Sequence, residues 1–208
     1  SPEKMVAEVE KNVATQIKKN KFTAVIGGEH SVTIGAIQAH AKHYKNLSIL
    51  QLDAHSDLRD KYNNSKYNHA CVMARAKELC PIVQVGIRSM DTSEINNMDM
   101  SRVFFAKDIH KNTNWIEQVN KKLTENVYIT IDLDVFDPSI MPSTGTPEPG
   151  GMLWYDVLEL LKVISQEKNI VGVDVVELCP NEQNKAPDFM AAKLIYKLLS
   201  YKFKDQTK

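Results

Sequence analysis

The chain has 208 residues, 43% of them hydrophobic, and its 26 basic and 26 acidic side chains leave no formal net charge at pH 7. Scattered lysines and the lack of any apolar stretch near 20 residues argue against a nucleic-acid partner, an anionic membrane surface and a membrane span. The three cysteines, Cys71, Cys80 and Cys179, form no Cys-x-x-Cys pair, so we expect no disulfide framework and a cytoplasmic location.

The expected elements alternate between helices and strands along one domain of residues 1–208. Ser1 followed by Pro2 predicts a helix that continues to about Asn20, and a strand follows at 22–26. A Gly-Gly turn then leads into a helix at 31–44. Further strands are expected near 47–52, 81–87, 102–106, 126–132 and 170–175, and further helices near 70–79, 113–124, 154–167 and 186–202. This alternation predicts an α/β fold of three αβα layers with a mainly parallel sheet.

Acidic residues and histidines gather in three short clusters, each directly after an apolar run that reads as a strand. The clusters are His30, then Asp53, His55 and Asp57, then Asp132 and Asp134. Because side chains alternate between the faces of a strand, the middle three are expected on one side and the last two on another. The carboxyl ends of parallel strands meet at one rim, where ligands collect. We therefore expect the three clusters to face one another.

The ligand types narrow the choice of metal. Four carboxylates bring four negative charges, two imidazoles add nitrogen, and no thiolate is present, which favours manganese ahead of iron, cobalt or zinc. Two such ions roughly 3.5–4 Å apart can hold a water as hydroxide near neutral pH. Taken singly, His30 could cap a helix and the Asp-x-Asp pair could be turn chemistry. Three ionisable groups after the apolar run 47–52 need compensation, however, and metal-assisted hydrolysis is the reaction class that we predict.

Two more residues at the same rim are candidates for binding a substrate or transferring a proton to it. Glu177 ends the last strand, and a carboxylate there could bind a planar guanidinium by two hydrogen bonds, or simply cap the strand end. His69 could protonate an amine leaving group, or simply begin a helix.

Four segments, at 27–31, 53–60, 131–138 and 145–151, resemble the motifs of the ureohydrolases, the arginase and agmatinase family. The resemblance runs through nearly the whole chain in the family's order, and it implies the arginase-like fold, two Mn²⁺ ions per chain and a homo-oligomer, trimeric or hexameric. Carried over by motif, the six ligands would be His30, Asp53, His55, Asp57, Asp132 and Asp134, with Asp57 and Asp134 shared between the ions. Asp57, Glu177 and His69 would be catalytic, with Glu177 binding the guanidinium and His69 moving the proton. Members of the family normally begin with a further strand, which we expect this domain to lack.

Within the family, the segments at 58–60 and 66–70 are similar to those of agmatinases. They stand where arginases carry the residues that hold an α-carboxylate. The resemblance therefore implies agmatine as substrate, attacked at its guanidinium carbon by a bridging hydroxide and released as putrescine and urea, a polyamine-forming reaction.

Three alternatives stay open. A sister ureohydrolase would use the same centre on guanidinobutyrate, another guanidino acid or formiminoglutamate. A binuclear phosphoesterase would need Arg or Lys beside the metals, where the chain instead offers Glu177. A catalytically silent family member would bind metal without releasing urea.

Overall fold

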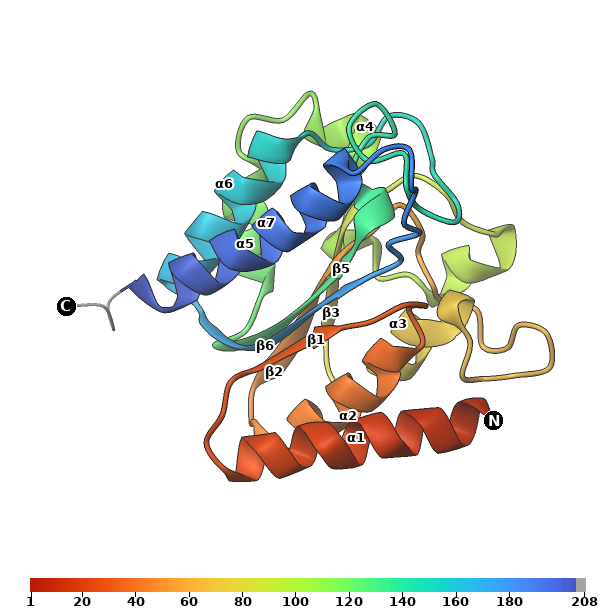
Figure 1. Cartoon of the computed structure of the whole chain (residues 1–208), viewed down its shortest axis with the longest axis vertical. Coiled ribbons are helices and arrows are strands. Elements are labelled where there is room, and N and C mark those ends of the chain that lie inside the picture. Colours follow the sequence, from red (N-terminus) through yellow and green to blue (C-terminus); the bar gives the residue numbers. More distant parts are fainter. Residues whose placement is uncertain (205–208) are drawn as a thin grey trace.

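A parallel sheet forms the centre of the computed structural model, which describes residues 1–204 (Figure 1). Its strand order is β1-β6-β5-β2-β3-β4, and every pairing is parallel. The strands are β1 Thr23–Ile26, β2 Leu47–Leu52, β3 Ile82–Ile87, β4 Val103–Phe105, β5 Asn126–Asp132 and β6 Asn169–Val176. All six carboxyl ends consequently meet at one edge of the sheet, as the sequence predicted.

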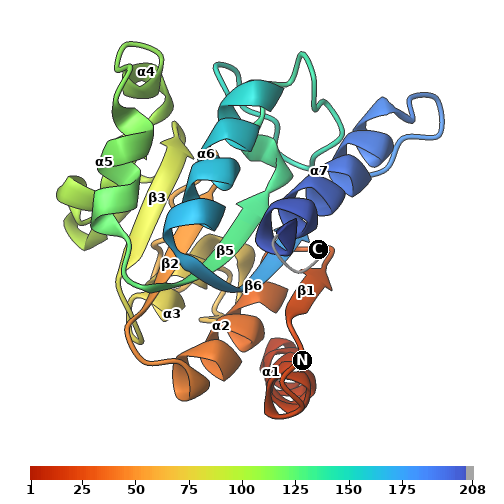
Figure 2. The same cartoon turned by 90° about the vertical axis from the view of Figure 1, so that its left-hand side faces the viewer.

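Helices cover both faces of this sheet, which confirms the three-layer αβα prediction (Figures 1 and 2). One layer contains α1 Pro2–Lys18, α2 Val32–His43 and α3 Val72–Ala76. The other contains α5 Trp115–Lys122, α6 Trp154–Glu167 and α7 Ala186–Lys202, and a short α4 Ala106–Ile109 precedes α5. No helix within residues 1–204 is both long and apolar enough to cross a membrane.

The first two helices pack unusually close together. Val6, Val13 and Ile17 recur at helical spacing on α1 and are buried. Opposite them on α2, a Cβ added to Gly35 would lie 2.4 Å from the Val6 carbonyl oxygen. Only glycine therefore permits this approach, and the tight contact holds α2, which begins at the candidate site, against α1.

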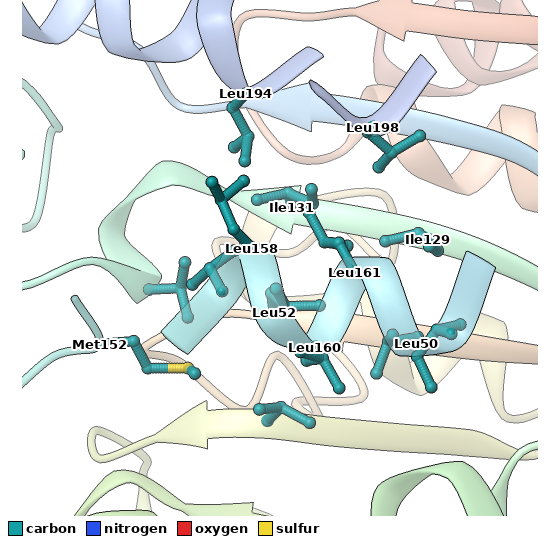
Figure 3. Close-up of a cluster of buried hydrophobic side chains, with 14 of the residues drawn as sticks. Leu50, Leu52, Ile129, Ile131, Met152, Leu158, Leu160, Leu161, Leu194 and Leu198 are labelled. Carbon is teal, nitrogen blue, oxygen red and sulfur yellow. The ribbon is translucent and has the colours of Figure 1, made fainter. Parts of the chain in front are cut away.

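The central strands are buried on both faces, so they carry the largest apolar cluster. Leu50 and Leu52 of β2 pack with Ile129 and Ile131 of β5 beneath α6 (Figure 3). Burial of each such side chain contributes roughly 1.5–3 kcal/mol. The register pairs Leu52 with Ile131, so the polar residues that follow these strands emerge side by side at the carboxyl edge.

Some boundaries differ from the prediction. The helix expected near 70–79 is a single turn at His69–Cys71 followed by the short α3, and α5 is likewise shorter than 113–124. Helix α4 and two 3₁₀ turns at Thr92–Asn97 and Met100–Arg102 were not predicted. Aspartate side chains cap both turns by local hydrogen bonds. Such turns have no apolar periodicity, so the sequence pattern does not indicate them.

Candidate metal centre

His30 lies between the Gly-Gly turn after β1 and the start of α2, and its Nδ1 points at three carboxylates. Nδ1 is 3.0 Å from Asp57 Oδ2, 3.4 Å from Asp53 Oδ2 and 3.5 Å from Asp132 Oδ2. All four side chains are buried. Within residues 1–204, Nδ1 has no hydrogen-bond partner although it is fully enclosed. A buried nitrogen surrounded by carboxylate oxygens is an arrangement that a divalent cation would satisfy.

A second group of potential ligands adjoins the first. His55 Nδ1 is 2.9 Å from Asp134 Oδ2 and 3.6 Å from Asp53 Oδ1. Asp53 thus directs Oδ2 toward His30 and Oδ1 toward His55, and it belongs to both groups that could hold an ion. Of the two histidines, only His30 shares a group with Asp57, and only His55 shares a group with Asp134. The sequence analysis expected Asp57 and Asp134 to be the shared ligands, whereas this geometry favours Asp53.

The side chains of Asp53, His55 and Asp57 point to the rim of the sheet for a different reason from the one predicted. Strand β2 ends at Leu52, so strand alternation does not extend over residues 53–57. Instead the His55 N–H donates to Asp53 Oδ1 at 2.6 Å, and Asp57 adopts a left-handed φ of 53°. A tight loop, stabilised by a side-chain acceptor, brings these three residues to the rim.

The electrostatics of the cluster favour bound cations. Burial and the charge of Asp53 raise the pKa of Asp57 to about 7. Burial and the charges of Asp134 and Asp53 raise the pKa of Asp132 well above its ordinary range. Carboxylates are costly to ionise together in a dry site unless a cation neutralises them. The residues therefore fit two divalent ions, and the side chains that would hold them are His30, Asp53, His55, Asp57, Asp132 and Asp134.

Glu177 lies beside this cluster without joining it. The residue follows β6 with a left-handed φ of 65°, and its N–H donates to the Gly28 carbonyl at 2.7 Å. Its Oε1 accepts the His30 N–H at 2.6 Å, which directs the carboxylate into a cleft of about 500 Å³ at the carboxyl edge. Burial raises the pKa of Glu177. A carboxylate that lies beside the metal ligands without joining them can bind a cationic substrate.

His69 lines the same cleft and is held by Glu29, a residue to which the sequence analysis gave no role. Glu29 Oε1 accepts the His69 backbone N–H at 2.8 Å and lies 2.9 Å from His69 Nδ1. The hydrogen bond to Glu29 raises the pKa of His69, whose side chain is 51% exposed. The position of Glu29 directly before His30 was the only sequence feature that could have indicated it.

Comparison with known proteins agrees with this geometry. Residues 1–200 match the model of the arginase family. The chain belongs to the arginase family.

Relatives within the family carry related names. The N(1)-aminopropylagmatine ureohydrolase of Synechocystis sp. is 40% identical over 98% of this chain and 68% of its own length. The agmatinase of Pyrococcus horikoshii is 34% identical over 93% of this chain and 67% of its own. The solved structure of the agmatine ureohydrolase of Thermoplasma volcanium has a TM-score of 0.88 at 35% identity, covering this whole chain and 72% of that one. The chain thus spans about two thirds of the length of these curated relatives.

Arg88 is a second residue that the sequence analysis missed in this arginase-family chain. Its guanidinium donates to the carbonyl oxygen of Asp134 at 2.6 Å and to that of Glu148 at 2.8 Å. These contacts tie the segment that carries Asp134 to the loop at 145–151. Arg88 therefore fixes one wall of the site through backbone contacts, which no local sequence pattern indicates.

Proposed function

We propose that this protein is a ureohydrolase that uses two divalent metal ions to hydrolyse agmatine to putrescine and urea. The placement of Glu177 is the observation that carries this proposal. A carboxylate beside the metal ligands, already directed by the His30 N–H, matches a planar guanidinium and would repel a phosphate ester. Glu177 therefore supports an amidine substrate over the phosphoesterase alternative, and Arg59, which lines the same cleft, is already paired with Asp91 and Glu94.

Manganese is the metal that we propose, since the four carboxylates are hard ligands and the two imidazoles also suit it. When bound, two such ions supply Lewis acidity that makes hydroxide available near neutral pH.

The chain's own residues would then divide the remaining work. Glu177 orients the guanidinium so that its carbon is open to water in the cleft. A C–O bond forms to that carbon and the C–N bond to the amine breaks. The departing amine nitrogen needs a proton, which His69 can donate because Glu29 favours its protonated form.

N(1)-aminopropylagmatine is a second candidate substrate. It is favoured because the 40% identical relative, whose name carries this substrate, is more similar to the chain than the 34% identical agmatinase. Both compounds present the same guanidino end, so Glu177 and His69 would act on either one. The far end of the substrate alone distinguishes them.

Assays of product release from several candidate substrates, run in parallel, test this function. Manganese-loaded protein would be assayed for urea from agmatine, N(1)-aminopropylagmatine, arginine and guanidinobutyrate, and for formamide from formiminoglutamate. Metal content would be measured on the same sample. We expect turnover of agmatine or its aminopropyl derivative with two ions per chain. Two bound ions with no product from any substrate would refute the proposed activity and favour a silent family member.

A further inference from the structure

A buried acid lies close to the metal centre but outside its ligand groups. Asp174 is in the middle of β6 and is fully enclosed, with 0% of its surface exposed. It takes part in neither group that could hold an ion, and the proposed reaction does not use it. A carboxylate buried in a sheet needs hydrogen-bond donors, and those of Asp174 come from the neighbouring strand.

Two hydroxyl groups of β5 supply these donors. Tyr128 Oη donates to Asp174 Oδ2 at 2.7 Å, and Thr130 Oγ1 donates to Asp174 Oδ1 at 2.7 Å. The parallel register places Thr130 directly opposite Asp174. On its other side, Thr130 Oγ1 lies 2.9 Å from His30 Nε2. The three side chains therefore form one line of hydrogen bonds from the sheet interior to a candidate ligand.

The position of the Thr130 hydroxyl hydrogen decides which groups donate and which accept in these hydrogen bonds. A threonine hydroxyl has one hydrogen to donate, and that of Thr130 is directed at Asp174 Oδ1. Since Thr130 gives its hydrogen to Asp174, its oxygen must accept a hydrogen bond from His30. His30 must then carry hydrogen on Nε2. The neutral imidazole consequently has its lone pair on Nδ1, the nitrogen that faces Asp53 and Asp57.

We propose that Asp174 and Thr130 are positioning residues that hold His30 in the Nε2–H tautomer and so present Nδ1 as a metal ligand. This inference rests on the metal centre of the proposed function and extends it to residues beyond the ligands. Hydrogen bonds behind a ligating histidine typically change metal affinity about 10- to 100-fold when removed. The effect should be confined to the ion beside His30, because Thr130 makes no recorded contact with His55 within the described residues.

Metal titration of single variants tests the proposal. Thr130→Val keeps the size of the side chain but leaves the His30 Nε2–H without an acceptor. We expect one of the two Mn²⁺ ions to bind this variant about 10- to 100-fold more weakly and the other to bind normally. Thr130→Ser should restore the affinity because it returns the hydroxyl. Binding to metal-depleted protein would be measured by chelator competition, with no assay of turnover.

The chain offers a matched control at the opposite end of the sheet. Thr23, the first residue of β1, is also a buried threonine whose Oγ1 contacts a histidine, lying 3.1 Å from His40 Nε2. His40 belongs to neither ligand group. Thr23→Val should therefore leave both Mn²⁺ affinities at the wild-type value. Equal losses in Thr23→Val and Thr130→Val would overturn the proposal, as would wild-type affinities in Thr130→Val.

Nitrogen-15 NMR of histidine-labelled wild-type protein gives a test that depends on no variant folding. With Zn²⁺ bound, His30 should show hydrogen on Nε2, and hydrogen on Nδ1 would overturn the inference. Neither experiment measures urea. A protein that binds two ions with this tautomer but turns over no substrate refutes the proposed function alone, whereas one that binds no ion refutes both.

Discussion

Glu177→Gln is the substitution that most directly tests whether Glu177 binds the guanidinium of the substrate in the cleft. Glutamine has nearly the same shape as glutamate and can keep one contact, since its side-chain oxygen can still accept the His30 N–H. It removes the negative charge that would face the guanidinium. The change should therefore affect the binding of a cationic substrate while leaving the metal ligands in place.

The size of the effect follows from the contacts of Glu177. Oε1 is engaged by the His30 N–H at 2.6 Å, so the hydrogen bond lost on substitution is the one from the substrate to Oε2. A hydrogen bond to a charged group contributes about 1.5–3 kcal/mol. This corresponds to a fall of roughly 10- to 150-fold in kcat/KM, since every 1.4 kcal/mol is about a factor of ten.

Steady-state urea release from agmatine would measure this change, with metal content determined on the same preparations. We expect a higher KM for Glu177→Gln with two ions still bound. Glu182→Gln, at an exposed position of the following loop, is the matched control and should behave as wild type. A normal KM for agmatine in Glu177→Gln would refute the guanidinium role, whereas loss of metal would show that the charge supports the centre instead.

Three further changes have defined outcomes. Asp134→Ala should lower the bound metal below two ions per chain and abolish turnover, and an unchanged metal content and rate would contradict its role as a ligand. Glu29→Gln removes the negative charge of the acid that raises the pKa of His69, so His69 should lose its proton at lower pH and the alkaline limb of kcat should move to lower pH; an unmoved limb would separate His69 from the proton transfer. Gly172→Ala would place a Cβ 2.3 Å from His40 Nε2 and should cost about 1–3 kcal/mol of unfolding free energy in urea, partly recovered by adding His40→Ala; additive losses would show that this clash is not the cause.

The sequence by itself determined the architecture and the set of candidate ligands. Apolar runs of strand length between amphipathic helices predicted a parallel sheet in three layers, which is what the structure contains. Because parallel strands end at one edge, the polar residues after each run had to meet there. The structure does bring His30, Asp53 and Asp132 together, and Glu177 lies beside them.

Only the tertiary structure decided how these residues are divided between two candidate ligand groups and what supports them. Asp53 joins the two groups because the chain leaves strand geometry after Leu52 and closes a tight loop, a conformation that alternation does not encode. Glu29, Arg88 and Asp174 each act on a residue far away in the chain. Their roles depend on hydrogen bonds that form only when separate strands and loops are packed at distances near 3 Å. For Arg88 and Asp174 no local pattern of residues indicates such a role, and for Glu29 only its position directly before His30 does.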